Sequence, residues 1–367
     1  MSNKLRVGIL FGGRSAEHEV SLQSAKSVVE ALNRAKYDVV LIGIDKTGKW
    51  YLNDASKFLL NAEDPSLIKL NTASAKEVAL VPGEAVNQLV PMSGSEPLGH
   101  LDVIFPVLHG PFGEDGTVQG MLKLANIPFV GVSVLGSAAC MDKDVTKRLL
   151  REAGIPTPKF LTFDRVKPDD VSFEDVEKEL GLPVFIKPAN LGSSVGIHKA
   201  HDKKEFEDGV KDALSFDTKI IVEEAIEGRE LECAVLGNEN PEASLPGEVK
   251  PSHEFYDYEA KYIDEHGAAL DIPAKVDEDV VKRVKELAVK TFTTLACEGM
   301  ARVDFFLKKN GELMVNEINT IPGFTKISMY PKLWQASGVP FDELLDRLIR
   351  LAIERFDREK GLRTSYK

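Results

Sequence analysis

The segment 301–323, ARVDFFLKKNGELMVNEINTIPG, constrains the fold more than any other part of the chain. Asn-Gly between two apolar runs is the strongest short-range signal for a β-hairpin, so Asn310-Gly311 predicts one with a two-residue type I′ turn. In that hairpin, residues at equal distances from the turn face each other. Asp304 is therefore expected opposite Glu317.

The predicted pairing has a chemical consequence. Two carboxylates directly opposite each other lie about 4.5–5.5 Å apart at Cβ and destabilise the sheet unless a cation lies between them. The same register pairs Arg302 with Asn319, and the period of two in a strand puts all four side chains on one face. Asp, Glu and Asn oxygens with no nearby His or Cys suit Mg²⁺ or Mn²⁺. The alternative is an exposed hairpin with hydrated charges. The apolar residues of both strands argue against it and indicate a cleft.

Composition excludes several classes of protein. The chain has 367 residues, enough for two or three domains, and its 43% hydrophobic and 28% charged residues are typical of a globular enzyme or binding protein. A net charge of −12 disfavours general binding of nucleic acid. It does not exclude anionic substrates, because local Lys and Arg can reverse the sign of the potential in a cleft.

The cysteines and the amino terminus predict a location. Cys140, Cys233 and Cys297 are widely spaced and odd in number, which is typical of buried thiols and not of a disulfide framework or a zinc site. No apolar run approaches the roughly 20 residues of a membrane helix. The opening MSNKLRVGILFGG has too short an apolar core for a signal peptide. We therefore expect a cytoplasmic protein without a membrane partner.

Strands and helices alternate along the chain. The first strand, a Gly12-Gly13 turn, a helix and a second strand form a βαβ unit, and open α/β sheets bind ligands at such turns. A dinucleotide site is the competing interpretation, but the G-x-G-x-x-G spacing is absent. Residues 51–98 have weak periodicity and elaborate this unit. Strands are predicted at 5–11, 39–44, 103–108, 182–187, 195–199, 219–224 and 231–236, and helices at 20–32, 117–124, 141–150, 277–297 and 341–357.

Two loops at strand ends are candidate binding sites. His109 ends a strand among glycines, in HGPFGEDG, and a site-lining role is favoured over a structural one. Lys187 ends another strand and leads into the Gly/Ser-rich loop 188–198, whose backbone N–H groups could approach phosphate oxygens. It is not a P-loop, because GxxxxGK[ST] is absent and a strand follows. A flexible linker is the alternative, weakened by the apolar strands on both sides.

These motifs, in this order, resemble the ATP-grasp superfamily and, at closer range, the D-alanine–D-alanine ligase family. The resemblance covers nearly the whole chain, with the poorest fit over residues 51–98. The segments that carry it are FGGRSAEHEVSLQSA, HGPFGEDGTVQG, MDKDVTK, IKPANLGSSVG, VEEAIEGRE, FYDYEAKY, ARVDFF and NEINTIPGFTKISMYP.

The resemblance implies a three-domain fold of mixed α/β and α+β class. An open α/β, Rossmann-like domain at 1–135 would bind substrate, a small lobe at 136–224 would carry the phosphate loop, and a lobe at 225–367 would carry the metal hairpin. It implies ATP-dependent joining of two D-alanines through an acyl phosphate, for peptidoglycan synthesis and so for the cell wall. A homodimer is also expected.

The resemblance further implies ligands for ATP and for two Mg²⁺ or Mn²⁺ ions, with Glu317 bridging the ions. The metal ligands would be Asp304, Glu317 and Asn319. The ATP-binding residues would be Lys143, Lys187, Ser193, Ser194, Glu223, Glu224, Ala225, Ile226, Glu230 and Lys261. Family members often carry lysine where Glu224 stands, so this residue receives no specific role.

Roles in substrate binding and catalysis are implied in the same way. Glu17 would bind the ammonium group of the first D-alanine, and Ser193 and Tyr262 would link to Glu17 and close a lid. Arg302 and the Gly323 N–H would stabilise the tetrahedral oxyanion. His109 would line the first subsite, and the second subsite would be formed by Ser328 and Met329.

Three other functions remain open at this point. Related ligases use D-lactate or D-serine as the second substrate, and Tyr262 resembles the D-alanine type. A non-catalytic ATP-binding module would need the metal and phosphate ligands, but it would have no use for Arg302 or Glu17. A metal-dependent phosphatase is disfavoured, since the sequence offers neither a nucleophile nor a metal-bridging His.

Overall fold

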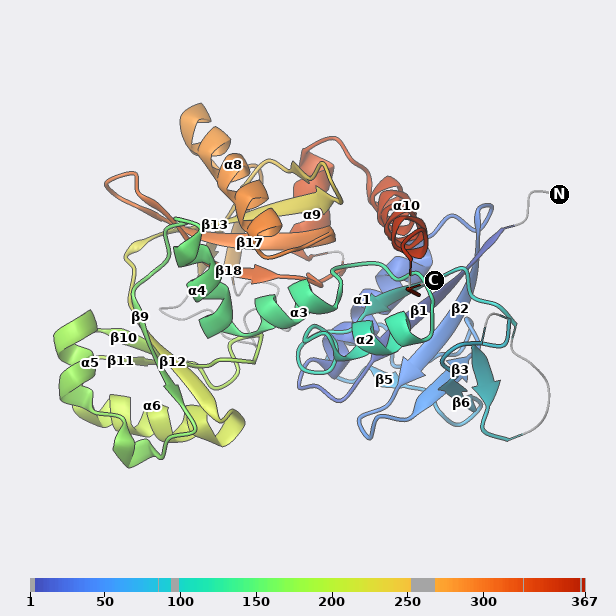
Figure 1. The fold of residues 1–367 in the computed structure, drawn as a ribbon, viewed down its shortest axis with the longest axis horizontal. Helices are drawn as coiled ribbons and strands as arrows, with labels where there is room; N and C mark the ends of the chain where they lie inside the picture. The colour runs from blue at the N-terminus through green and yellow to red at the C-terminus, as the bar shows by residue number, and fades with distance from the viewer. Residues whose placement is uncertain are drawn as a thin grey trace.

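The computed structural model describes residues 4–84, 86–93, 99–251, 268–325, 327–363 and 365–366. Three sheets of four to six strands and one two-stranded ribbon organise it. In Figure 1 the first sheet lies on the right, the second at lower left and the third at upper left. In chain order the elements are β1 Leu5–Gly12, α1 His18–Ala31, β2 Tyr37–Ile44, β3 Trp50–Asn53, β4 Leu59–Leu60, β5 Lys69–Leu70, β6 Lys76–Leu80, β7 Leu89–Pro91, β8 Val103–Val107, α2 Thr117–Leu124, α3 Val134–Met141, α4 Lys143–Glu152, β9 Phe160–Asp164, a 3₁₀ turn Pro168–Asp170, α5 Phe173–Leu180, β10 Val184–Pro188, β11 His198–Ala200, α6 Lys203–Phe216, β12 Lys219–Glu224, β13 Gly228–Gly237, β14 Glu242–Ala243, β15 Gly247–Pro251, β16 Ala268–Asp271, α8 Glu278–Thr294, β17 Gly299–Lys308, β18 Leu313–Asn319, α9 Met329–Ala336 and α10 Phe341–Lys360.

The first sheet has the order β7-β6-β3-β2-β1-β8. Its parallel part is β2-β1-β8, as the βαβ pattern predicted, and three antiparallel strands from the segment of weak periodicity extend it. Gly12 allows the turn after β1, because its φ is +91° and a Cβ there would lie 2.1 Å from the Ile44 carbonyl oxygen. The carboxyl ends of β1 and β8 therefore open at the same sheet edge.

The second sheet is antiparallel, in the order β11-β10-β12-β9, and has its own core with α5 and α6. The predicted return strand is confirmed as β11, which pairs antiparallel with β10, but it begins at His198 and not at Val195. Ser193, Ser194 and Gly196 have φ of 50°, 61° and 68°, a left-handed conformation that no strand accommodates. The Gly/Ser-rich loop therefore joins β10 and β11 as a compact turn, and the second strand starts only after it.

The third sheet contains the hairpin of β17 and β18, and there the predicted two-residue turn is wrong. A type I′ turn needs positive φ at both central residues, and of Asn310 and Gly311 only Gly311 has it, at 82°. The Gly311 N–H donates to the Lys308 carbonyl at 2.9 Å, and the Lys308 N–H donates to the Glu312 carbonyl at 2.9 Å. The loop thus has three residues, which moves the register by one.

A β-bulge at Asn316 moves the register back. Phe305 pairs with Val315, whereas Asp304 pairs with Glu317, so Asn316 is the extra residue. The predicted pairs Asp304–Glu317 and Arg302–Asn319 are confirmed. On β18, Val315 and Ile318 pack into the same core with α8, so the bulge switches the alternation and turns Glu317 toward the opposite face.

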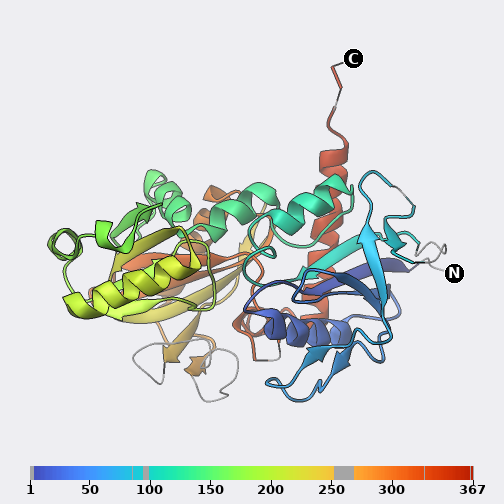
Figure 2. The ribbon, with the colours of Figure 1, turned by 90° about the horizontal axis from the view of Figure 1, so that it is seen from below.

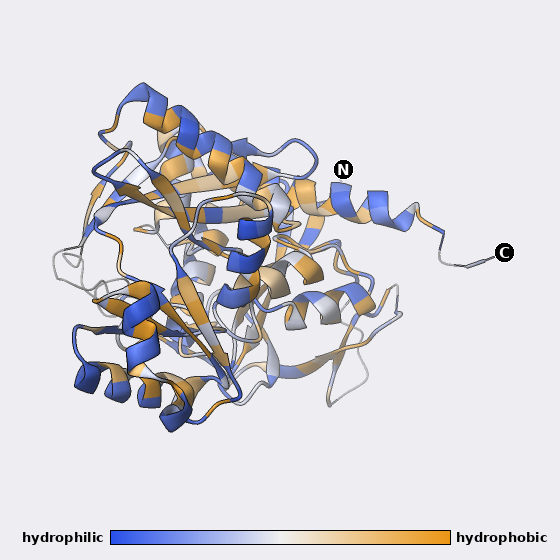
Figure 3. Cartoon of the chain, turned by 60° about the vertical axis from the view of Figure 1, so that its left-hand side comes forward, coloured by the Kyte–Doolittle hydropathy of each residue, from blue (hydrophilic) through white to orange (hydrophobic). Residues whose placement is uncertain are grey.

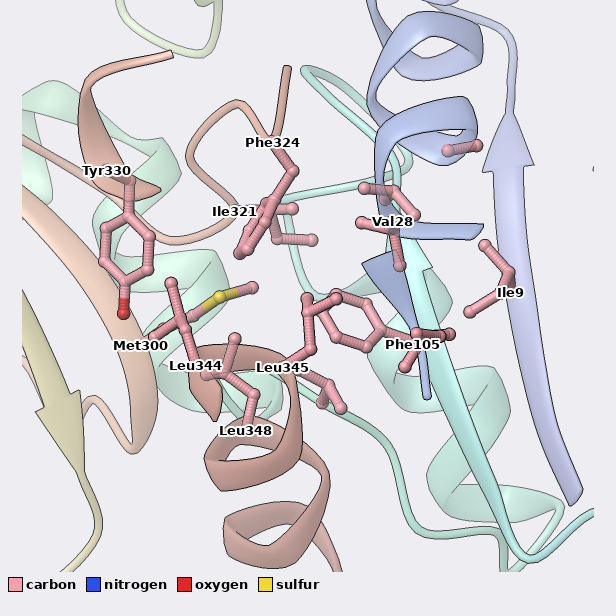
Figure 4. Packing of buried hydrophobic residues seen from close by; sticks show 14 of the residues in the cluster. Ile9, Val28, Phe105, Met300, Ile321, Phe324, Tyr330, Leu344, Leu345 and Leu348 are labelled. Atoms are coloured by element: carbon pink, nitrogen blue, oxygen red, sulfur yellow. The ribbon is translucent and has the colours of Figure 1, made fainter. Parts of the chain in front are cut away.

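A continuous core joins the first and third sheets. The carboxyl-terminal helix α10 contacts α1 and β8 on one side and β13 and β17 on the other, and Figure 2 shows it running between the two halves of the molecule. Phe105, Met300, Phe324 and Leu345 belong to this core, whose close packing Figure 4 shows. Figure 3 shows hydrophilic outer faces on the helices and hydrophobic strands beneath them.

Within the ranges given above, no helix is long and apolar enough to cross a bilayer. The mixed α/β and α+β class is confirmed by the three sheets. The domain boundaries near 135 and 224 stay predictions.

Candidate active site

A pocket of about 240 Å³ lies where the three sheets meet. It takes side chains from the ends of β1 and β8, from the second sheet and its Gly/Ser-rich loop, and from the inner face of the third sheet. The predicted site residues in its lining are Glu17, His109, Lys187, Ser193, Ser194, Glu223, Glu224, Ile226, Glu230, Arg302, Asp304, Glu317, Asn319, Gly323, Ser328 and Met329. The predicted cleft on the charged face of the hairpin is confirmed.

Four predicted residues are not among the lining side chains. Lys261 and Tyr262 lie outside the described residues. Lys143, the first residue of α4, donates a hydrogen bond from Nζ to the Leu191 carbonyl in the Gly/Ser-rich loop. The Ala225 N–H donates to the Pro183 carbonyl at 3.2 Å, next to the lining residue Ile226. Both therefore border the pocket.

Glu17 is buried just before α1, between the loop after β8 and the Gly/Ser-rich loop. The predicted hydrogen bond is present, with the Ser193 hydroxyl donating to the Glu17 carboxylate. A Cβ on Gly110 would lie 2.6 Å from Glu17 Oε2, and one on Gly192 would lie 3.2 Å from it. The glycines in both loops thus make room for this carboxylate.

His109 is held in the neutral form. Its Nδ1 lies 3.0 Å from the Ile321 carbonyl oxygen and must donate there, which leaves Nε2 to accept from the Ser24 hydroxyl at 3.2 Å. Burial, opposed only in part by the bond to Ile321, lowers the pKa of His109 to about 4. His109 therefore orients the loop after β18 and carries no charge near neutral pH.

The pKa of His109 predicts a loss of stability in acid. The folded-state pKa is depressed, so the unfolded chain takes up a proton near pH 6.5 that the folded chain refuses until about pH 4. The wild type should lose about 2 kcal/mol more unfolding free energy than His109→Gln between about pH 7 and about pH 5. Urea titrations of both proteins measure this, and parallel curves would contradict it.

Glu114 is a pocket residue that the sequence did not single out. Its Oε2 accepts from the Gly110 N–H at 2.8 Å and its Oε1 from the Ile321 N–H at 3.0 Å, so it joins the loop after β8 to the chain after β18. Burial, with repulsion from Glu17 as the second cause, raises the pKa of Glu114 to about 8. Glu114 therefore ionises less readily than an exposed glutamate.

Three carboxylates form a row across neighbouring strands of the third sheet. Glu232 on β13 pairs with Asp304 on β17, which pairs with Glu317 on β18. Arg302 lies among them, with Nε and Nη2 each 2.7 Å from Asp304 oxygens and Nε 2.8 Å from Glu232 Oε2. The Asn319 amide donates to Asp304 at 3.0 Å. The guanidinium thus provides the positive charge that the predicted pairing of acids requires.

The oxygen atoms around this row suit a hard divalent ion. The Asn316 side chain lines the pocket beside Glu317, and its Oδ1 is buried without a hydrogen-bond partner among the residues that the structure describes. Among all the residues that the structure describes, no group of three or more His, Cys, Asp or Glu side chains is arranged to hold a metal without other ligands. Ligands from Asn side chains and from a phosphate would have to complete the coordination, as is usual for Mg²⁺.

A second group of charges lies between the second sheet and α4. Lys187 Nζ is 2.7 Å from Glu223 Oε2, and Lys147 Nζ is 2.9 Å from Glu223 Oε1. Burial alone would lower the pKa of Lys187, but attraction to Glu223 and their hydrogen bond raise it above its usual value. Against the effect of burial, Lys147 and Lys187 hold the pKa of Glu223 at about 2. Lys143 interacts electrostatically with Lys147, Lys187 and Glu223, so three ammonium groups gather here. Such a cluster favours an anionic ligand.

The remaining predicted residues occupy the rim. Glu224 Oε1 accepts from the Lys159 N–H at 2.7 Å, and Glu230 is on the inner face of β13. Ser328 Oγ accepts from the Thr325 N–H at 3.0 Å, and a Cβ on Gly323 would approach it to 2.7 Å. Gly323 and Ser328 thus lie against each other at the start of α9.

Sequence reasoning missed Lys147, Glu232 and Asn316 as well as Glu114. Two of them carried a signal. Lys147 is four residues after Lys143 on one helix face, and Glu232 is two residues after Glu230 on one strand face. Nothing in the sequence marks the bulge at Asn316.

Comparison with known proteins gives a consistent result. Residues 6–132 match a family model described as the D-ala D-ala ligase N-terminus, and residues 149–350 match the D-ala D-ala ligase C-terminus. The D-alanine–D-alanine ligase of Oceanobacillus iheyensis is 57% identical over 362 residues, which cover 99% of each protein.

Two solved structures add information about ligands. The VanG D-Ala:D-Ser ligase of Enterococcus faecalis is 40% identical with a TM-score of 0.83, covering 95% of this chain and all of that one. The D-alanine–D-alanine ligase of Bacillus anthracis complexed with ATP is 28% identical with a TM-score of 0.73, covering 98% of this chain and all of that one. The fold is therefore shared by enzymes that differ in their second substrate.

Proposed function

This chain belongs to the D-alanine–D-alanine ligase family, with its ATP-grasp fold, and we propose that its pocket joins two D-alanines at the expense of ATP. The product, D-alanyl-D-alanine, serves peptidoglycan synthesis. The observation that carries the proposal is a single pocket lined by Glu17, Lys187 and Arg302, which come from the loop after β1, from β10 and from β17. These residues offer an anion for an ammonium group, a cation for phosphates and a donor for an oxyanion.

The reaction needs two displacements. A carboxylate oxygen of the first D-alanine attacks the γ-phosphorus of ATP, and the bond from that phosphorus to the ADP oxygen breaks. The amino nitrogen of the second D-alanine then attacks the acyl carbon and loses a proton, while the carbon–oxygen bond to phosphate breaks. The chain's task is to orient the reactants, neutralise charge and exclude water.

We assign the substrate-binding roles by position in the pocket. Glu17, with His109 beside it, would hold the ammonium group of the first D-alanine. Arg302 and the Gly323 N–H would donate to the oxyanion, and Ser328 with Met329 would bind the second D-alanine. The proposal is supported by the location of all these residues in one lining.

The nucleotide would lie between the second sheet and the third sheet. Lys143 and Lys187 would bind phosphates, with Ser193 and Ser194 over them. Glu223 and Glu230 would meet the adenine amino group and the ribose, beside Ile226. Asp304, Glu317 and Asn319 would hold two Mg²⁺ or Mn²⁺ ions, which when bound neutralise the phosphate oxygens. A cytoplasmic location and a homodimer are part of the same proposal and rest on family resemblance.

The test is ATP hydrolysis with and without D-alanine, with the product identified by mass. We expect phosphate release that depends on D-alanine and yields one dipeptide per phosphate. Turnover that is independent of D-alanine, or a mixed dipeptide preferred when D-serine is added, would replace the proposal with another ligase of this family.

Tyr262 provides a prediction about the second substrate. If its hydroxyl helps to close the lid and select an amine, Tyr262→Phe should raise the fraction of D-alanyl-D-lactate formed when D-alanine and D-lactate compete. Product analysis measures the ratio, with Tyr51→Phe as the control, because Tyr51 lies on β3 and its hydroxyl bonds to Asp45. An unchanged ratio would contradict the lid assignment.

A further inference from the structure

Lys147 is a buried lysine for which the proposed reaction has so far no use. It lies on α4, one helical turn after Lys143, and its side chain is only 2% exposed. It is not among the residues that line the pocket, whereas its ion-pair partner Glu223 is. A lysine is almost never buried to this degree unless a specific charge requires it.

Each carboxylate oxygen of Glu223 faces a different lysine. One carboxylate oxygen faces Lys187 at 2.7 Å, and the other faces Lys147 at 2.9 Å. Lys187 lines the pocket with 11% of its side chain exposed, while Lys147 lies behind the carboxylate. The two lysines therefore approach Glu223 from the pocket side and from the interior.

Lys147 also reaches the third sheet. Its Nζ donates to the Asn316 carbonyl oxygen at 3.2 Å, at the bulge that turns Glu317 toward the pocket. One ammonium group thus fixes the carboxylate of β12 and the bulged backbone of β18. Because it is held from two sides, Lys147 is not available to follow a ligand.

We propose that Lys147 is a positioning residue that serves as the permanent counter-ion of Glu223 and so frees Lys187 to bind nucleotide phosphates. A buried carboxylate that loses its only cation is strongly destabilised. With Lys147 in place, Lys187 can leave Glu223 while Glu223 stays ionised and able to accept a hydrogen bond from the ligand. The proposal rests on the proposed ATP site and adds a residue to it.

The charge balance supports this division of roles. Attraction to Glu223 keeps Lys187 protonated despite burial, and Glu223 is held ionised by both lysines. Burial lowers the pKa of Lys147, and attraction to Glu223 is the main effect that opposes this lowering. Without Lys147, Glu223 would keep Lys187 as its ion-pair partner. A phosphate would then have to break the ion pair between Lys187 and Glu223 before it could bind Lys187. Removing Lys147 should therefore weaken binding of phosphates in particular.

The experiment uses Lys147→Met, which keeps the length of the side chain and removes the charge. We expect the Kd for ATP to rise about 10- to 100-fold, with a matching rise in KM for ATP, while the Kd for adenosine and the KM for D-alanine change less than about threefold. Lys147→Arg should restore most of the ATP affinity. Lys203→Met is the matched control, since it removes a lysine from the exposed pair with Glu174.

The same substitution made in the Glu223→Gln variant separates a positioning role of Lys147 from a general effect on folding. In Glu223→Gln there is no carboxylate to neutralise, so adding Lys147→Met should cost little further ATP affinity. Equal losses in both backgrounds, or equal losses of ATP and adenosine affinity, would overturn the proposal. If Lys147→Met does not fold, Lys147→Gln takes its place. The Kd values for ATP and for adenosine are then compared for Lys147→Gln in the wild type and in Glu223→Gln. Failure of the wild type to bind ATP would instead refute the proposed function.

Discussion

Glu317→Gln is expected to lower kcat by about 10³-fold or more, because a metal-assisted phosphoryl transfer draws several kcal/mol from ligand charge and each 1.4 kcal/mol is about tenfold. Glutamine keeps the shape of the side chain but offers one neutral oxygen in place of a carboxylate. Glu317 pairs with Asp304 on the face that lines the pocket. Phosphate release at saturating ATP and D-alanine measures kcat.

The Glu317 prediction has a second readout and a matched control. Binding of Mn²⁺ in the presence of ATP, followed by electron paramagnetic resonance, should weaken in Glu317→Gln. Glu312→Gln makes the same change at the exposed end of the same hairpin, where Glu312 pairs with Lys308 at 3.1 Å, and it should retain kcat. Full activity or unchanged Mn²⁺ binding in Glu317→Gln would remove this residue from the metal site.

The hairpin shows how far sequence reasoning can reach. Asn310-Gly311 correctly marked the turn, and the apolar strands correctly predicted a cleft face. The turn type was wrong, because Asn310 does not take the left-handed conformation that a two-residue loop demands. The pairing of Asp304 with Glu317 was nevertheless right, since the extra loop residue and the bulge at Asn316 shift the register in opposite directions.

The bulge could not be predicted from alternation. In a regular strand with this turn, Asn316 and Ile318 would face the pocket, and Glu317 would face the core with α8. Burying Ile318 and exposing Glu317 to the pocket is more favourable than the reverse. This gain in free energy offsets the inter-strand hydrogen bonds that are lost at the bulge. A pattern of period two does not show where such a compensation occurs.

Contacts between segments far apart in the sequence were the other limit. The bond from Ser193 to Glu17 was expected from family resemblance, and it is present. Glu114 contacts Ile321 and Lys147 contacts Asn316, and each contact depends on how distant segments of the chain pack. Local spacing places Lys147 on the face of Lys143 but cannot say which acid it meets.

Arg302→Met is expected to lower kcat by about 10²- to 10³-fold, the usual effect of removing one oxyanion donor. Arg302→Lys should recover only part of this, because an ammonium group cannot donate the two parallel hydrogen bonds that the guanidinium makes to Asp304. Arg283→Met is the control, since Arg283 donates to the Gly311 carbonyl at 2.8 Å, far along the hairpin from the acids. Steady-state kinetics with D-alanine varied measure kcat.

Loss of charge balance must be separated from loss of the oxyanion donor. Arg302 is the cation between Glu232 and Asp304, so Arg302→Met also leaves two acids facing each other. Adding Glu232→Gln relieves that repulsion and should restore thermal stability, but it cannot restore a donor. If the double variant regains both stability and kcat, Arg302 is a structural counter-ion; if it regains stability alone, the guanidinium acts on the reacting atoms.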